Sequence, residues 1–172
     1  NQRGTPAVPA APAAPYGSHP AITPEFINAI KRVENSTGNP MAVSPKGATG
    51  PMQVMPATFA QMSQQYFGGK LNPQSPADQE QAGVAFLHHL ANVELPRRGI
   101  PVTPENLASA YQQGAGGLAK NGVSGNVTDG ITNNSAYVAK VLAGMGGAPG
   151  APAAPGAPAP PGAAPAQPTA GL

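Results

Sequence analysis

Nearly all of the large apolar residues of this chain lie between residues 22 and 145, where several stretches repeat with the period of a helix. From position 26 on, apolar side chains stand at 26, 27, 30 and 33, which is the spacing of one buried helical face. Glu34 falls on the same face, four residues after Ile30 and seven after Ile27. Because a carboxylate is seldom placed on a buried face, the pattern predicts a helix that directs Glu34 toward the interior or the floor of a cleft.

Three segments combine a hydroxyl residue, a proline and an early acidic residue, a combination typical of helix starts. The hydroxyl caps a free N–H, proline at the first helical position loses no hydrogen bond, and the carboxylate is stabilised by the positive end of the helix dipole. We therefore expect helices that begin near residues 24, 76 and 104, in the segments Thr23-Pro24-Glu25, Ser75-Pro76-Ala77-Asp78 and Thr103-Pro104-Glu105.

The same periodicity predicts five helices in all and leaves no run of alternating apolar and polar residues for a sheet. The first helix carries Glu34. The others are expected from Pro56 to Tyr66, from Pro76 to Pro96, from Pro104 to the glycines Gly114, Gly116 and Gly117, and from about Asn134 to Leu142. The predicted fold class is all-α.

Proline and alanine crowd both ends of the 172-residue chain, where proline recurs too often for a helix and large side chains are too few for a core. We expect a Pro/Ala-rich linker at 1–20, one domain at 21–147 and an Ala/Pro/Gly-rich linker or tail at 148–172. Both tails are expected to be disordered or extended spacers. They either tether the domain within a longer protein or serve as solubilising ends, and the sequence leaves both readings open.

Composition excludes several classes of chemistry. The chain has no cysteine, so it offers neither a disulfide nor a thiolate metal site nor a thiol nucleophile. Its net charge is +2 and its basic residues are scattered, which argues against a nucleic-acid partner and suits an anionic polymer such as a bacterial wall. No apolar stretch approaches the roughly twenty residues of a membrane span. The adjacent His88 and His89 point to different helix faces and lack further ligands, so we expect surface or packing histidines, no metal and no other cofactor.

The segment 39–53 is dense in glycine and proline and lies between two predicted helices, so its backbone must turn tightly several times. Such a segment suits a loop that lines a groove, and the plain alternative is an ordinary irregular connection. Ser44 stands in this segment without the histidine and aspartate partners that a serine hydrolase would need.

Short motifs occur in a fixed order through the domain: Glu34-Asn35-Ser36, Asn39-Pro40, Ala42-Val43-Ser44-Pro45, Gly47-Ala48, Gly50, Met52-Gln53-Val54-Met55-Pro56, Tyr111-Gln112-Gln113-Gly114 and Tyr137-Val138. In order, spacing and residue types they resemble the soluble lytic transglycosylase (SLT) domain family, and the resemblance covers most of residues 25 to 142. Three positions depart from the residues usual in that family. Asn35 replaces a serine, Pro51 replaces a leucine, and Gln112-Gln113 replaces Asn-Ala, which puts in doubt the contacts made near Tyr111.

The resemblance implies a lysozyme-like helical domain with a substrate groove and a role for each matching residue. Glu34 would be the catalytic acid/base. Ser44 and Gln53 would help to bind or orient the sugar, Met55 would line the groove, and Tyr111 would hold the glutamate or the substrate.

The implied activity is a peptidoglycan lytic transglycosylase that cuts the MurNAc–GlcNAc β-1,4 bond without water and leaves 1,6-anhydro-muramoyl ends. Its partner would be the glycan strands of peptidoglycan, met by a monomeric domain tethered within a larger protein. The place of action would be the bacterial cell envelope (periplasm), reached in envelope remodelling, through a secretion system or on a phage particle. Two alternatives remain: a hydrolysing muramidase of the same fold and a non-catalytic peptidoglycan-binding module.

The number of acids bears on this choice, because most glycosidases use two carboxylates. Apart from Glu34, five acids stand at predicted helix starts, in a charged helix end or in a turn: Glu25, Asp78, Glu94, Glu105 and Asp129. A lone carboxylate fits a mechanism in which the N-acetyl group of the substrate stabilises the developing cation. A general acid must hold its proton at neutral pH, and burial of Glu34 would raise its pKa accordingly.

Overall fold

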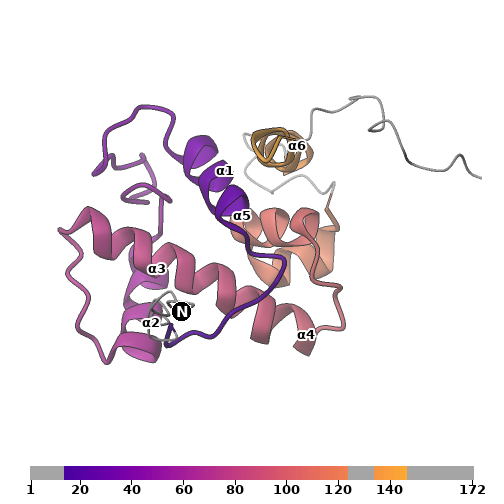
Figure 1. The fold of residues 1–172 in the computed structure, drawn as a ribbon, viewed down its shortest axis with the longest axis horizontal. Helices are drawn as coiled ribbons and strands as arrows, with labels where there is room; N and C mark the ends of the chain where they lie inside the picture. Colours follow the sequence, from indigo (N-terminus) through magenta and orange to yellow (C-terminus); the bar gives the residue numbers. More distant parts are fainter. Residues whose placement is uncertain (1–13, 124–133, 147–172) are drawn as a thin grey trace, which may run out of the picture.

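The computed structural model describes residues 14–123 and 134–146, and within them the fold is helical (Figure 1). The elements in chain order are α1 (Pro24–Glu34), α2 (Pro56–Phe67), α3 (Pro76–His89), the π-helix η1 (Leu90–Glu94), α4 (Leu95–Arg97), α5 (Pro104–Asn121) and α6 (Asn134–Gly144). In this part of the chain, extended pairing is limited to two isolated bridges, from Thr49 to Val43 and to Val54. The all-α prediction is confirmed.

The three predicted helix starts are confirmed by their capping hydrogen bonds. The side-chain oxygens of Thr23, Ser75 and Thr103 each accept a bond of 3.2 Å, from the backbone N–H groups of Phe26, Asp78 and Asn106 respectively. In each case a proline follows the cap, as expected for a residue that has no N–H to satisfy.

The predicted third helix, from Pro76 to Pro96, corresponds to α3, the π-helix η1 and the short α4, which follow one another without a break and end at Arg97. One predicted helix end is wrong, because the fourth helix does not end in its glycines. Gly114 adopts a left-handed backbone (φ 77°, ψ 156°) that kinks α5, and the helix then continues to Asn121 because Ala115 and Leu118 are buried in the core.

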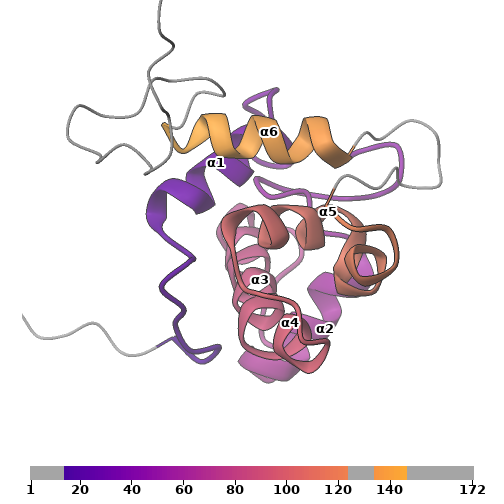
Figure 2. The ribbon, with the colours of Figure 1, turned by 90° about the vertical axis from the view of Figure 1, so that its right-hand side faces the viewer.

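The helices pack around one apolar core. In both ribbon views α1 and α6 lie side by side at one end of the molecule, with α5 next to them, while α2 packs along α3 (Figures 1 and 2). Burial of each large apolar side chain stabilises the fold by about 1.5–3 kcal/mol. The largest fully buried ones are Phe26, Ile30, Met52, Met62, Leu87, Leu90, Leu95, Leu107 and Val141.

Part of the segment predicted to be a linker packs against the domain. The ring of Tyr16 stacks on His88 with centroids 4.9 Å apart, and lies 6.3 Å from Tyr66 and 6.1 Å from Phe67. The described part of that linker, residues 14–20, therefore lies on α2 and α3. The domain boundary at residue 20 stays a prediction, and the predictions for residues 1–13 and for the 148–172 tail lie outside the described residues. Among the described helices, none is long and apolar enough to cross a membrane.

Candidate active site

The loop of residues 39–54, called here the 39–54 loop, is held by its own hydrogen bonds and by close packing on α3. Gly50 has φ 89°, and a Cβ atom built on it would lie 2.7 Å from Cβ of Gln79, so only glycine allows this approach. Gly83 of α3 likewise leaves room for Met52 of the loop. A Cβ atom built on Gly83 would lie 2.7 Å from the sulfur and 2.8 Å from the Cβ of Met52. The loop is thus fixed against the helix that crosses beneath it.

Glu34 is the last residue of α1 and is half-buried, as its place on the apolar face predicts. Its Oε1 atom accepts a hydrogen bond of 2.5 Å from the hydroxyl of Tyr137 on α6. Burial raises the pKa of the Glu34 carboxyl from its ordinary 4.5 to about 7, and the hydrogen bond from Tyr137 opposes part of that rise. The group therefore exchanges its proton near neutral pH, which suits a single acid/base.

Tyr111 lies close to this carboxyl without bonding to it. Its hydroxyl donates a hydrogen bond of 2.8 Å to the backbone carbonyl of Met52, and its ring packs against Phe86 with centroids 5.5 Å apart. Burial and then the negative charge of Glu34 raise the pKa of Tyr111 well above its ordinary value. In the described residues, the hydrogen bond that holds Glu34 thus comes from Tyr137.

The sequence placed Tyr137 in the family pattern but assigned it no part in the site. The only sign in the sequence of a role for Tyr137 in the site was its position on the apolar face of the last predicted helix. Its partner stands 103 positions earlier in the chain, and no local pattern joins the two.

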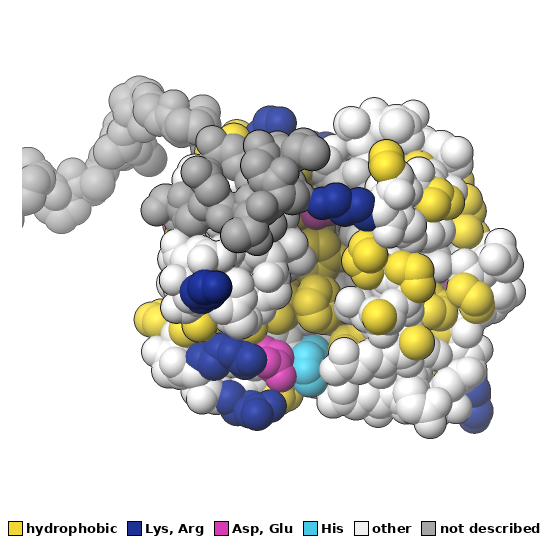
Figure 3. All heavy atoms as spheres, turned by 180° about the vertical axis from the view of Figure 1, so that it is seen from behind, with side chains coloured by type: hydrophobic (Ala, Val, Ile, Leu, Met, Phe, Trp, Pro, Cys, Tyr) yellow, Lys and Arg dark blue, Asp and Glu magenta, His cyan; other side chains and the backbone are white. Residues whose placement is uncertain are grey.

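Three of the predicted site residues come together around a small hollow, called here the Tyr111 hollow. Gln53, Met55 and Tyr111 line it together with Val54, Thr58 and Phe86, and its volume is about 50 Å³. Met55 is 44% exposed. From behind, the surface shows a depression between two lobes with hydrophobic side chains on its floor (Figure 3).

Gln53 also holds the 39–54 loop in shape. Its Nε2 atom donates to the carbonyl oxygens of Ala42 and Gly50, at 2.9 and 3.0 Å. Its backbone has φ 49°, a value that residues with a side chain seldom adopt. Both protons of its amide nitrogen are used within the loop, so its carbonyl oxygen is the atom left to face a ligand.

Ser44 lies in a tight turn of the same loop and does not line the Tyr111 hollow. Its Oγ atom accepts a hydrogen bond of 3.0 Å from the N–H of Ala48, and its own N–H donates to the carbonyl of Ala48 at 2.8 Å. The structure thus gives Ser44 a part in shaping the turn, and its predicted contact with the sugar stays a prediction.

Two other acids in the described residues, Asp78 and Glu80, have partners of their own. Asp78 accepts a hydrogen bond of 2.8 Å from the N–H of Asn72 in the first turn of α3. Glu80 pairs with Lys31 on α1 at 2.8 Å. Asp129, predicted to lie in a turn, falls outside the described residues. Asp78 and Glu80 therefore each have a partner other than Glu34.

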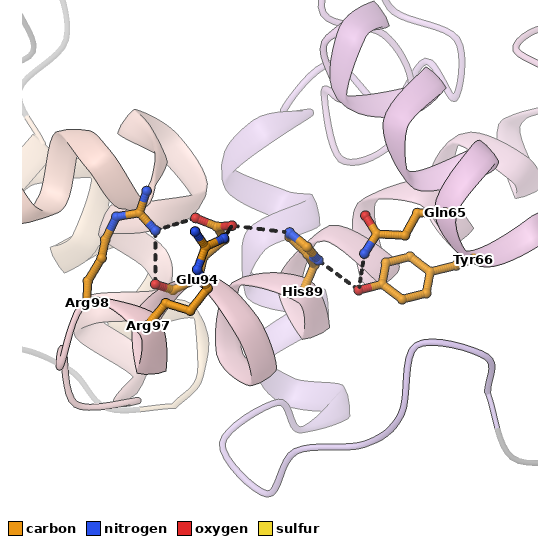
Figure 4. Close-up of polar contacts among 6 residues, drawn as sticks. All are labelled: Gln65, Tyr66, His89, Glu94, Arg97 and Arg98. Carbon is orange, nitrogen blue, oxygen red and sulfur yellow. Dashed lines mark hydrogen bonds and ion pairs between the residues drawn. The ribbon is translucent and has the colours of Figure 1, made fainter.

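His88 and His89 are confirmed as packing residues, with 7% and 6% of their surface exposed. The Nδ1 atom of His89 lies 2.7 Å from the hydroxyl of Tyr66, and its Nε2 atom lies 3.6 Å from Oε1 of Glu94 (Figure 4). Glu94 also pairs with two arginines, Arg97 at the end of α4 and Arg98 directly after it. In the part of the chain that the structure describes, no three His, Asp or Glu side chains are grouped so that they could hold a metal ion.

The sequence model of the transglycosylase SLT domain family matches residues 13–131, well over half of the chain. The chain belongs to this family. The resemblance read from the loop motifs is thereby confirmed, and the SLT domain takes in α1 to α5. Among curated proteins, no match was found.

Two solved structures share the fold of this SLT domain. An inactive mutant of the lytic transglycosylase Slt from Pseudomonas aeruginosa is 24% identical with a TM-score of 0.52, over 70% of this chain and 20% of that one. The 70 kDa soluble lytic transglycosylase from Escherichia coli is 23% identical with a TM-score of 0.51, over 72% of this chain and 21% of that one. The chain thus spans about a fifth of the length of either enzyme.

Proposed function

We propose that this SLT domain is a peptidoglycan lytic transglycosylase, with Glu34 as its acid/base. The observation that carries the proposal is the half-buried carboxyl of Glu34, whose pKa is about 7 and whose position is fixed by the Tyr137 hydroxyl. Such a group gives up a proton and takes one back at neutral pH. The family and the two similar structures support the same class of reaction.

In the first step, protonated Glu34 donates its proton to the oxygen of the MurNAc–GlcNAc β-1,4 bond, which breaks at the anomeric carbon of MurNAc. The carbonyl oxygen of the neighbouring N-acetyl group stabilises the positive charge left on the ring. In the second step, the Glu34 carboxylate removes the proton of the 6-hydroxyl, whose oxygen closes on the anomeric carbon. The product is a 1,6-anhydro ring, and Glu34 again carries its proton.

The Tyr111 hollow would hold part of the sugar next to this carboxyl. Gln53 would offer its amide oxygen, Met55 an apolar surface, and Tyr111 the part of the wall that is influenced by the charge of Glu34. Ser44 would keep the turn of the 39–54 loop in place and could meet the sugar at its rim. Together these residues would orient the glycan while Glu34 exchanges its proton.

The proposed place of action is the bacterial cell envelope (periplasm), where glycan strands are met by a monomeric domain tethered within a larger protein. Envelope remodelling, a secretion system or a phage particle would each bring such a domain to the wall. No cofactor takes part in the proposed reaction.

Digestion of purified sacculi, with mass analysis of the released muropeptides, tests the proposal. Wild type should release anhydro-muramoyl ends, and Glu34→Gln should lower the rate at least about 10²-fold because the proton donor is lost. Glu80→Gln is the matched control, since it removes a carboxyl that pairs with Lys31, and it should cut nearly as fast as wild type. Reducing ends would instead show a hydrolysing muramidase, and no release would show a binding module.

A further inference from the structure

Two buried polar side chains join the start of α6 to α5. Asn134, the first residue of α6, and Ser109 of α5 both have an exposed fraction of 0%. The Nδ2 atom of Asn134 donates a hydrogen bond of 2.8 Å to Oγ of Ser109, and it also donates to the backbone carbonyl of Val123. The amide of Asn134 therefore ties α6 both to α5 and to the chain that follows α5.

Gln113 of α5 holds Ser109 from the other side. Its Nε2 atom donates to the same Oγ of Ser109 at 2.8 Å and to the carbonyl of Gly122 at 3.1 Å, while its Oε1 atom accepts from Nδ2 of Asn121 at 3.3 Å. A Cβ atom built on Gly117 would lie 3.1 Å from Cβ of Gln113, so the glycine leaves room for this side chain. Gln113 departs from the residue usual in the family, and here it fixes Ser109.

Asn134 is not placed there for stability alone. Its Oδ1 atom is buried and has no hydrogen-bond partner among the described residues, and a buried acceptor without a partner destabilises a protein. A leucine of nearly the same size would avoid that penalty. The amide at position 134 instead provides direction, because a hydrogen bond fixes the angle and distance between two helices more narrowly than apolar packing does.

Tyr137 depends on this contact, because it follows Asn134 by three residues and so lies one turn further along the same face of α6. In Figure 2 α6 lies across both α1 and α5. Its far end is close to α1, since a Cβ atom built on Gly144 would lie 3.1 Å from Cβ of Ala29. Tyr137 is nearer to the contact at Asn134, and its hydroxyl meets Oε1 of Glu34 at 2.5 Å. A hydrogen bond weakens steeply when its geometry changes, so a small shift of the start of α6 would weaken this bond.

We propose that Asn134 and Ser109 are positioning residues for the proposed reaction: their hydrogen bond fixes the start of α6 on α5 and so holds the Tyr137 hydroxyl against the carboxyl of Glu34. Both act through Tyr137 and not by contact with the substrate. This inference rests on the proposed function for the part that the carboxyl plays in cleavage.

Glu34 is the group that reports on this arrangement. Among the described residues, Tyr111 of α5 and Tyr137 of α6 are the titratable groups that face it from the neighbouring helices. Burial and the charge of Glu34 raise the pKa of both tyrosines well above their ordinary 10.0, so both keep their protons at neutral pH. A movement of the Tyr137 hydroxyl therefore shows in the pKa of Glu34.

The first test measures the pKa of Glu34 without substrate, from the pH dependence of its side-chain ¹³C carboxyl signal in NMR spectra. Asn134→Leu should raise this pKa by at least about half a unit, because the Tyr137 hydroxyl then favours the charged form less. Val141→Ala is the matched control, since it removes buried methyl groups from the same face of α6 but leaves the contact at Asn134 intact, and it should keep the wild-type pKa. An unchanged or lowered pKa in Asn134→Leu, or an equal shift in the control, would overturn the inference.

A double-mutant cycle tests whether Asn134 acts through Tyr137. In the Tyr137→Phe protein, Asn134→Leu should produce no further rise in the pKa of Glu34, because the bond through which it acts is already gone. Additive shifts would refute the inference. If Asn134→Leu does not fold, Ser109→Ala takes its place in both comparisons, since it removes the acceptor of the same hydrogen bond and should give the same results.

Cleavage of purified sacculi gives the last test. The alkaline limb of kcat/KM should move to higher pH in Asn134→Leu by the shift that NMR measures for Glu34, and should stay in place in Val141→Ala. A limb that stays in place in both would overturn the part assigned to Asn134 in cleavage. If the wild-type protein does not cut, the proposed function fails, whereas the NMR titrations still decide whether Asn134 and Ser109 hold Tyr137 against Glu34.

Discussion

At the scale of single residues, the carboxyl that is proposed to do the chemistry also weakens the fold when it is charged. The folded protein holds the Glu34 proton up to a pKa of about 7, whereas an unfolded chain releases it near 4.5. The favourable contribution of the neutral carboxyl is therefore complete below pH 4.5 and is lost as the pH rises through 7. Catalysis near neutral pH takes place in the range where that contribution is disappearing.

Glu34→Gln should consequently be more stable than wild type in alkaline solution. The two proteins should unfold at similar urea concentrations at pH 4.5, because Glu34 is then neutral when folded. At pH 8.5 the free energy of unfolding of the variant should exceed that of wild type by on the order of 3 kcal/mol. Urea titrations at the two pH values measure the difference. A gap of the same size at both would mean that the ionisation of Glu34 is not its cause.

Tyr137→Phe should change the pH dependence of cleavage. The Tyr137 hydroxyl donates to Glu34 and so favours its charged form, and removing the bond should raise the pKa of Glu34 above 7. The alkaline limb of kcat/KM should move to higher pH by about one unit, since hydrogen bonds to charged groups are worth about 1.5–3 kcal/mol.

Tyr66→Phe serves as the control for that experiment. It also removes a tyrosine hydroxyl, but one that meets His89. Its profile should coincide with that of wild type. A limb that stays in place or moves to lower pH in Tyr137→Phe would contradict the assigned role of this bond.

The sequence was enough to predict that Glu34 lies on a buried helical face, but not which side chains surround it. The spacing of apolar residues along α1 suffices to put Glu34 on a buried face, because that is a property of one helix. The bond to Tyr137 joins the first helix to the last and depends on how all the helices between them pack. That Tyr137 bonds to Glu34, whereas Tyr111 bonds to the backbone of Met52, is visible only in the folded chain.

At the scale of elements, α3 and the 39–54 loop are in close van der Waals contact at Gly83 and Met52. Gly83→Ala should destabilise the protein by about 1–2 kcal/mol, because its new methyl group would overlap Cβ and the sulfur of Met52 and outweigh the better helix propensity of alanine. The matched control is Gly116→Ala, also in a helix but with no atom near the added methyl group. It should stabilise by up to about 1 kcal/mol. Urea unfolding compares the two, and equal changes would show that the contact with Met52 does not matter.

Helix starts were predictable from the sequence, whereas the end of α5 was not. A start depends on a hydroxyl, a proline and an N–H group within four residues, which can be read locally. The end of α5 depends on Ala115 and Leu118 reaching the core after the kink at Gly114. The passage of α3 into η1 comes just before Pro96, which has no N–H to donate and interrupts the α-helical hydrogen-bond pattern.

At the scale of the whole molecule, Tyr16 packs the segment of residues 14–20 against α2 and α3. Tyr16→Ala should lower the free energy of unfolding by about 1–2 kcal/mol, through loss of its ring contacts with Tyr66, Phe67 and His88. Ser18→Ala, at an exposed position of the same segment, is the control and should leave it within about 0.5 kcal/mol. Thermal or urea unfolding measures both. Equal stability of the two variants would mean that the segment contributes nothing to the fold.

The all-α architecture could be predicted from the sequence because each helix carries its own apolar face. The anchoring by Tyr16 could not, because one tyrosine among prolines and alanines gives no periodic signal. Its partners lie on α2 and α3, fifty or more residues away along the chain. A contact of this kind is visible only once those helices are packed together.

The hydroxyl of Tyr111 bonds to the main chain at Met52 and makes no use of the methionine side chain. Any amino acid at position 52 would supply the same carbonyl oxygen, so a loop taken from a relative could keep this hydrogen bond whichever residue it carries at position 52. The size of the side chain at position 52 is restricted, however, because it packs against the Cα atom of Gly83. Loop exchange between relatives should therefore succeed when residues 52 and 83 are moved as a pair.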